Sequence, residues 1–107
     1  MAFPLLRDAF EGDSAELSDF SAILQRELRQ AAQELDSAIR TRDAQAVADL
    51  KHKLKTSLQL LGDAQLKVNL ARLATDMQGG HAPSPSAREQ VVVRLRQLAT
   101  ALEREQW

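Results

Sequence analysis

The chain has 107 residues and contains no cysteine and no tyrosine. Without cysteine, disulfide bonds, thiol catalysis and thiolate metal sites are excluded, and a reducing cytoplasm is a compatible location. No apolar run approaches the roughly 20 residues that a membrane-spanning helix needs. Residues 1–8 lack a basic segment followed by a long apolar core, so we expect no signal peptide. We therefore expect a cytoplasmic protein without membrane contact.

An excess of charge of one sign is also missing. The 14 basic and 15 acidic side chains leave a net charge of −1, so no overall field attracts nucleic acid or an anionic membrane. Aromatic residues make up only 4% of the chain, and prolines number three, whereas alanine, leucine, glutamine, glutamate and arginine dominate. This composition favours helix almost everywhere. At this length we expect one domain with one core, spanning residues 1–107.

Four helical segments are expected from the apolar spacing. Asp13 and Glu16 form a capping box that opens a long helix, which should end near residues 40–42. Asp43 can cap a helix over residues 44–61, which Gly62 would terminate, and Asp63 can cap the next. The inward stripe of that third helix should consist of Leu66, Leu70, Leu73 and Met77.

Residues 79–86 form the main expected loop, since glycine, proline and serine are concentrated there. A second capping box, Ser86 to Glu89, would open the last helix just after Pro85; its inward residues would be Val91, Leu95, Leu98 and Leu102. Near the start, a short helix or turn is expected to lie across the bundle through Phe3, Leu5, Leu6 and Phe10. The predicted fold is all-α: an antiparallel up-down four-helix bundle with a short N-terminal extra helix or turn.

The position of His52 is the most informative feature of the helix over residues 44–61. At about 100° per residue, one face of this helix consists of Val47, Leu50, Leu54, Ser57, Leu58 and Leu61. His52 lies roughly 170° from the centre of that face, so it should project into solvent. Lys55 follows it one turn later, with Thr56 and Gln59 nearby. Taken alone, the run of Lys51, Lys53 and Lys55 is what a solvated helix face would show.

These residues resemble the phosphoacceptor helix of histidine phosphotransfer (HPt) domains, which act in two-component phosphorelays. The family pattern, His-x-x-Lys-Gly-Ser followed by Leu-Gly at the helix end, is similar to His52, Lys55, Thr56, Ser57, Leu61 and Gly62. Upstream, residues 10–13 and 36–43 also look like the family's approach to the histidine. The likeness extends from about Asp13 to Leu73, and beyond that point only a helical pattern remains.

The resemblance implies that His52 is a phosphoacceptor and that Lys55 stabilises the phosphoryl group electrostatically. An imidazole titrates near pH 6.5, so at pH 7 much of it is already nucleophilic without an activating base. The transition state of phosphoryl transfer spreads charge over the equatorial oxygens, which a nearby cation favours. Phosphate neighbours or docking contacts are expected at Lys51, Thr56, Gln59 and Leu60, with Leu60 exposed beside the histidine.

The expected function is that of a phosphorelay carrier in signal transduction. The chain would accept a phosphoryl group from one receiver-domain aspartate and pass it to another, acting as a phosphohistidine intermediate rather than an autonomous kinase. By resemblance, its partners are response-regulator receiver domains, and both a free-standing monomer and a domain of a hybrid sensor histidine kinase fit the pattern. We expect no cofactor and no metal on this chain, with Mg²⁺ held by the receiver.

Two alternatives come from other functional classes. The first is a non-catalytic helical docking module that binds a receiver or another protein without phosphoryl exchange. The second, an acid–base enzyme, lacks paired buried carboxylates or a base near His52. The other histidine, His81, stands in the glycine- and proline-rich loop and is expected to be incidental, and two distant histidines without cysteine make no zinc pattern.

The chain departs from the family pattern at two positions. Thr56 stands where glycine is usual, which could either narrow a partner's approach or supply a hydroxyl to the phosphate. The third helix often offers glutamine or glutamate opposite the histidine, and the aligned position here is Ala74. The imidazole would then be oriented by Arg72, Thr75 or Gln78, or by water. These departures concern the rate and the choice of partner more than the nucleophile itself.

Overall fold

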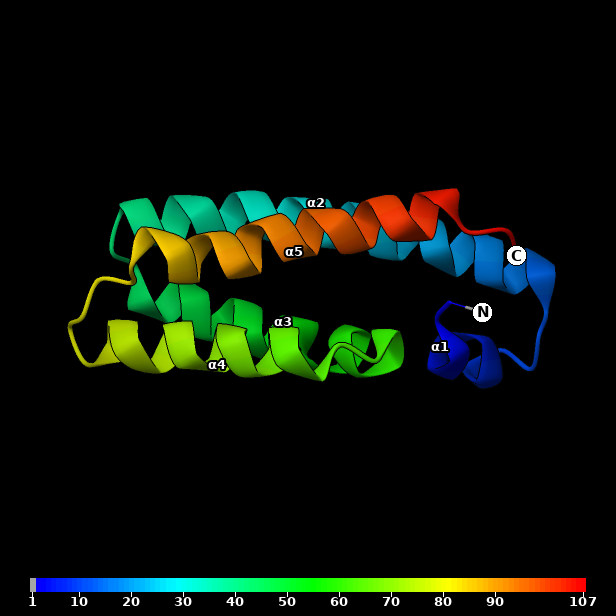
Figure 1. The fold of residues 1–107 in the computed structure, drawn as a ribbon, viewed down its shortest axis with the longest axis horizontal. Helices are drawn as coiled ribbons and strands as arrows, with labels where there is room; N and C mark the ends of the chain where they lie inside the picture. Colours follow the sequence, from blue (N-terminus) through cyan, green and yellow to red (C-terminus); the bar gives the residue numbers. More distant parts are fainter. Residues whose placement is uncertain (1) are drawn as a thin grey trace.

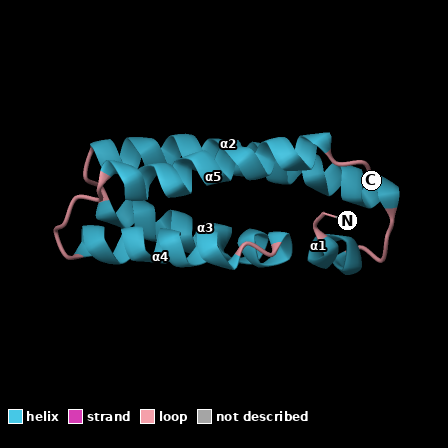
Figure 2. Cartoon of the chain, in the orientation of Figure 1, coloured by secondary structure: helices cyan, strands magenta, loops and turns pink. Residues whose placement is uncertain are grey.

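The computed structural model describes residues 2–107 and contains only helices and their connections within that range (Figures 1 and 2). The five helices are α1 (Pro4–Ala9), α2 (Ser14–Arg40), α3 (Ala44–Leu61), α4 (Ala64–Gln78) and α5 (Pro85–Arg104). The predicted all-α class is therefore confirmed. The described part of the chain contains no helix both long and apolar enough to span a membrane.

The helix starts depend on the aspartates that the sequence singled out. The carboxylates of Asp13, Asp43 and Asp63 each accept a hydrogen bond, of 3.0–3.1 Å, from the backbone N–H three residues later. Such a bond satisfies one of the four N–H groups that a helix start leaves unpaired. At the other end of α3, Gly62 has a φ of 72°, the left-handed conformation in which glycine commonly ends a helix. These caps confirm the predicted boundaries of α2, α3 and the start of α4.

The predicted start of α5 is wrong by two residues. Its cap is Ser84, whose hydroxyl accepts from the backbone N–H of Ala87 at 3.1 Å, and Pro85 is the first helical residue. Proline is well suited to that position, because its fixed φ matches the helix and its missing N–H would have been unpaired there. The prediction of a capping box at Ser86 did not take this preference of proline into account.

The four long helices form an antiparallel bundle in which α2 packs on α5 and α3 packs on α4 (Figure 1). Contacts of α2 with α3 and of α4 with α5 close the ring, so neighbours in the sequence are also neighbours in space. The core is built mainly from leucine. The predicted inward residues of α4 and α5 and the apolar ones of α3 are buried, whereas Ser57 of α3 is half-buried. The most completely buried of the core's large side chains are Leu6, Leu17, Leu24, Leu28, Leu35, Leu54, Leu58, Leu66, Leu70, Leu73, Leu95 and Leu102.

The helices differ in length, and α1 fills the space that this leaves. With 27 residues, α2 is about 40 Å long, whereas the 18 residues of α3 reach only about 27 Å. In Figure 1, α1 lies beyond the turn between α3 and α4, under the end of the longer pair. Leu6 of α1 is completely buried there, and Leu5 lies beside Gly62. The predicted short N-terminal element is thus a helix that closes one end of the core.

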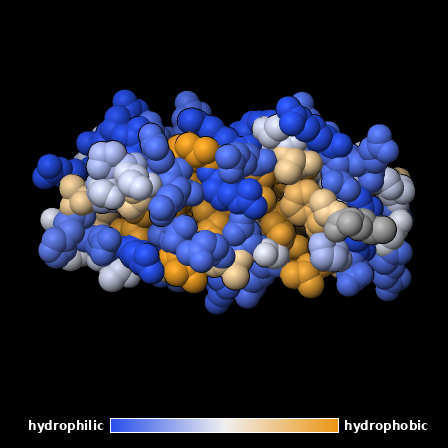
Figure 3. Space-filling model, in the orientation of Figure 1, coloured by the Kyte–Doolittle hydropathy of each residue, from blue (hydrophilic) through white to orange (hydrophobic). Residues whose placement is uncertain are grey.

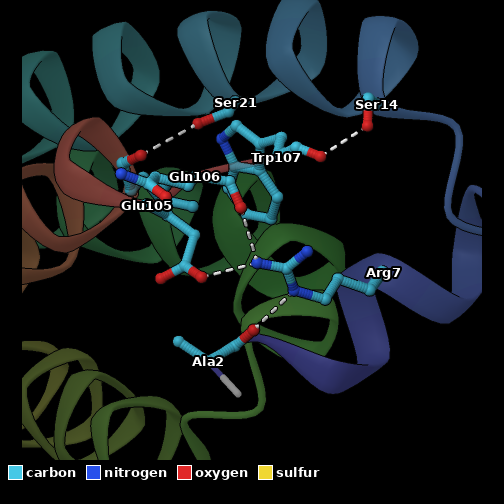
Figure 4. A network of polar contacts seen from close by, with 8 residues as sticks. Ala2, Arg7, Ser14, Ser21, Glu105, Gln106 and Trp107 are labelled. Atoms are coloured by element: carbon cyan, nitrogen blue, oxygen red, sulfur yellow. Dashed lines mark hydrogen bonds and ion pairs between the residues drawn. The ribbon is translucent and has the colours of Figure 1, made fainter.

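Polar contacts hold α1 to the residues that follow α5 (Figure 4). The guanidinium of Arg7 forms an ion pair with Glu105 at 2.5 Å and donates to the carbonyl oxygens of Ala2 and Gln106 at 3.1 Å. It also lies 4.7 Å from the centre of the Trp107 ring, a cation–π distance. These contacts join the two ends of the described chain into one structural unit.

Candidate functional site

The outward face of α3 presents His52 to solvent, as the sequence predicted. Five apolar residues of the predicted inward face are buried: Val47, Leu50, Leu54, Leu58 and Leu61. His52 and Lys55 are both exposed. Since the buried leucines fix the rotation of α3 within the bundle, the direction in which His52 projects is set by the core.

A cleft of about 260 Å³ lies beside His52, between α3 and α4. Its α3 side is formed by Lys51, His52 and Lys55, and its α4 side by Lys67 and Ala71. The side chains of Leu58 and Leu70, each only 1% exposed, form an apolar floor. The histidine therefore stands at the edge of a hollow with cationic walls and an apolar base.

Helical geometry explains why the predicted neighbours of His52 do not all meet in this cleft. At 100° per residue, Lys51 and Lys55 lie to one side of His52, and they line the cleft toward α4. Thr56 and Leu60 lie to the other side, facing away from it. Gln59 continues the ridge of His52 itself, one turn beyond Lys55, and is exposed. Of the predicted phosphate neighbours, the cleft brings together Lys51 and Lys55 and leaves out Thr56, Gln59 and Leu60.

The predicted exposure of Leu60 is wrong. Its side chain is half-buried and packs against the hydrophobic core. The prediction assumed that α3 has a single buried face, which points toward the centre of the bundle. In the structure α1 and α2 also contact α3, and Leu60 packs against the core that these helices share.

Ser57 serves a structural contact instead of the cleft. Its hydroxyl lies 3.0 Å from a carboxylate oxygen of Glu27 on α2, to which it donates a hydrogen bond. The hydroxyl faces the helix on the opposite side of α3 from α4. This contact agrees with the sequence analysis, which placed Ser57 on the inward face of the helix.

On α4, the residue aligned with the family's glutamine or glutamate does not line the cleft. Ala74 is 2% exposed and belongs to the core. Arg72, Thr75 and Gln78, the alternatives considered for orienting the imidazole, do not line the cleft either. The α4 side chains at the cleft are Ala71 and Lys67, with Leu70 at the floor.

Sequence reasoning missed Lys67, although a signal for it was present. Only Gly62 and Asp63 separate α3 from α4, so the two helices form a tight antiparallel hairpin. Equal steps from this turn pair Leu58, at the floor of the cleft, with Lys67 on α4. Counting from the turn along the whole cleft would have found Lys67, whereas aligning one family position to His52 did not.

The cations of the cleft have no partner among the described residues. The five ion pairs in that part of the protein all use arginine, and none includes a lysine. No side-chain hydrogen bond within residues 2–107 involves His52 or a lysine. No carboxylate lines the cleft. The ammonium groups are thus free to bind an incoming anion.

A larger hollow, of about 580 Å³, lies between α4 and α5, but neither a histidine nor a lysine lines it. Its lining includes four amide side chains, the ion pair of Asp63 with Arg94 at 2.7 Å, and Arg72 and Glu89, which form no ion pair among the described residues. On the face shown in Figure 3, hydrophilic residues cover much of the surface and apolar ones show between the helices. Within residues 2–107, no cluster of three histidine or acidic side chains could hold a metal ion. The histidine cleft is therefore the better candidate site, although it is the smaller hollow.

The chain matches no protein-family model, and neither curated proteins nor solved structures include a significant match to it.

Proposed function

We propose that this protein is a phosphorelay carrier of the histidine phosphotransfer type, with His52 as the phosphoacceptor. The observation that carries the proposal is the exposed His52 on a core-anchored helix, at the edge of a lysine-lined cleft without a carboxylate. A phosphoacceptor must be reachable by a second protein and must have positive charge close by. A histidine packed in the core could not be reached by a second protein.

The proposed step forms one bond and breaks one. The unprotonated ring nitrogen of His52 attacks the phosphorus of a receiver's aspartyl phosphate, and the phosphorus–oxygen bond to the aspartate breaks. The phosphoryl group moves to the imidazole, the aspartate leaves as a carboxylate, and the ring's other N–H proton can pass to water. In the reverse direction, the aspartate of a second receiver attacks the phosphohistidine and releases neutral His52 once the ring carries a proton again.

Lys55 has the electrostatic role in this proposal. It follows His52 by three residues, so the two side chains project from neighbouring positions on the outer face of α3. Both line the same cleft. An ammonium group there favours the dianionic phosphoryl group and the charge that develops on its oxygens during transfer.

The partners follow from the same proposal. Response-regulator receiver domains, free or within a hybrid sensor histidine kinase, would dock over α3 and α4, and the receiver would supply the Mg²⁺. The chain itself would act in the cytoplasm, as a monomer, and as an intermediate in transfer rather than as a kinase.

A docking module without phosphoryl exchange is the second candidate, and two observations favour it. Thr56 adds a branched side chain where the family has glycine, and α4 brings neither glutamine nor glutamate to the cleft. A partner could then cover the apolar floor of the cleft without transferring a phosphoryl group.

Transfer from a phosphorylated receiver separates the two candidates. The protein would be mixed with a panel of receiver domains carrying a radiolabelled aspartyl phosphate. A carrier acquires a label that is labile in acid and stable in alkali, as phosphohistidine is, and returns it to a second receiver. If receivers bind the protein but no such label appears on it, the docking module is the correct function.

A further inference from the structure

The distribution of lysine in this chain is uneven. All four lysines, Lys51, Lys53, Lys55 and Lys67, lie in α3 and α4, whereas the other ten basic residues are arginines. Five of those arginines form ion pairs among the described residues, and the lysines form none. The two kinds of cation thus have different surroundings in this protein.

Three of the four lysines converge on the histidine cleft. Lys51 and Lys55 approach it from α3, and Lys67 approaches it from α4. Like charges that share a hollow repel one another, and the apolar floor of Leu58 and Leu70 reduces the screening by water. A bound anion relieves this repulsion, and it gains more from cations on two sides than from cations on one.

We infer that the cleft is a two-sided anion site in which Lys67 of α4 binds the phosphoryl group on His52 from the side opposite Lys55. The ligand class is a tetrahedral phosphoryl dianion, either attached to the histidine or free as inorganic phosphate. This inference rests on the proposed function for the attached form, and the free form can be tested without it.

A merely structural explanation for Lys67 makes a different prediction. Its aliphatic stem could cover apolar surface between α3 and α4 while its ammonium group stays in water. Lys67→Met keeps that stem and removes the charge, so a structural role would survive this substitution. Lys67→Arg keeps a cation and should retain most of the phosphate binding.

Lys53 provides the matched control. It stands on α3 next to His52 and is exposed, yet it does not line the cleft. Lys53→Met removes the same charge from the same helix pair and therefore has the same effect on net charge. A difference between the two methionine variants reports on the position of the charge and not on its mere presence.

The experiment has two arms, each run on the complete protein and on the variants Lys67→Met, Lys67→Arg and Lys53→Met. In the first, inorganic phosphate is titrated at low salt while NMR follows the His52 imidazole and the lysine side chains. In the second, the rate of phosphoryl transfer from a labelled receiver is measured as a function of salt. Circular dichroism checks that each variant keeps its helices.

We expect phosphate to shift the signals of His52, Lys55 and Lys67 more than that of Lys53. Lys67→Met should remove most of the His52 shift and slow transfer about fivefold, the effect of one close charge in a well-solvated setting. It should also weaken the salt dependence of the rate. Lys67→Arg should restore most of both, and Lys53→Met should match the unmodified protein.

The two proposals fail in different ways. If Lys67→Met and Lys53→Met behave alike in both arms, or if phosphate shifts all four lysines equally, the anion site is refuted while the carrier stands. If the protein accepts no phosphoryl group, but phosphate shifts His52 and Lys67→Met abolishes the shift, the carrier is refuted and the anion site stands.

Discussion

Gly62 offers a quantitative test of how the helix that carries His52 is terminated. Its φ of 72° lies in the left-handed region, where a side chain at the Cβ position costs about 1–2 kcal/mol. Space is not the difficulty, because a Cβ built there would meet only the Leu5 Cδ1 atom at 3.7 Å, an ordinary contact. The predicted loss of stability for Gly62→Ala is therefore about 1–2 kcal/mol and comes from backbone conformation.

For a chain of this size, that loss corresponds to a fall in Tm of about 4–16 °C. Thermal unfolding followed by circular dichroism would measure it. Gly62→Asn should cost less than Gly62→Ala, because asparagine adopts the left-handed region more readily. The control is Gly79→Ala, because Gly79 has a φ of −80° and the nearest obstacle to a Cβ is the exposed side chain of His81. If Gly79→Ala destabilised the protein as much as Gly62→Ala, or if asparagine were no better than alanine at Gly62, the argument from φ would be wrong.

Three further predictions concern the core, the chain ends and the outer face of α3. Leu54→Ala should destabilise the protein by about 2–5 kcal/mol in urea unfolding, because Leu54 is only 1% exposed; a loss below 1 kcal/mol would contradict the packing of α3. Arg7→Met should lower the free energy of unfolding by about 1–3 kcal/mol, because it leaves the largely buried carboxylate of Glu105 without its partner. It should not change the rate of phosphoryl transfer, and a slower transfer would show that α1 reaches the site. Thr56→Gly should lower the free energy of unfolding by about 0.5–1 kcal/mol, and it should speed transfer if the threonine methyl obstructs docking. If the hydroxyl binds phosphate, Thr56→Val should transfer more slowly than the unmodified protein and Thr56→Gly. Equal transfer rates for the unmodified protein and both variants would refute both roles.

Features that depend on local chemistry could be predicted from the sequence. The aspartate caps, the left-handed Gly62 and the exposure of His52 each follow from a few neighbouring residues and the period of the helix. The same holds for the all-α class, because the four apolar stripes have no other way to be buried than against one another. Local signals were sufficient for these features.

Features that depend on a second helix could not be predicted in the same way. Leu60 is half-buried because other helices also contact α3, and a helical wheel of α3 contains no information on them. Lys67 lines the cleft because of the register between α3 and α4. The family alignment placed Ala74, which is buried, opposite the histidine instead. The prediction of the start of α5 was wrong for a local reason, because the preference of proline for the first helical position was overlooked at Pro85.

The most direct test of the central claim is the fate of a phosphoryl group in the His52→Gln variant. Its stability should be close to that of the unmodified protein, because an exposed side chain outside the core contributes little to folding. We predict that the unmodified protein and His81→Gln take an acid-labile label from a phosphorylated receiver and that His52→Gln takes none. If His52→Gln still carried the label, or if only His81→Gln lost it, His52 would not be the phosphoacceptor.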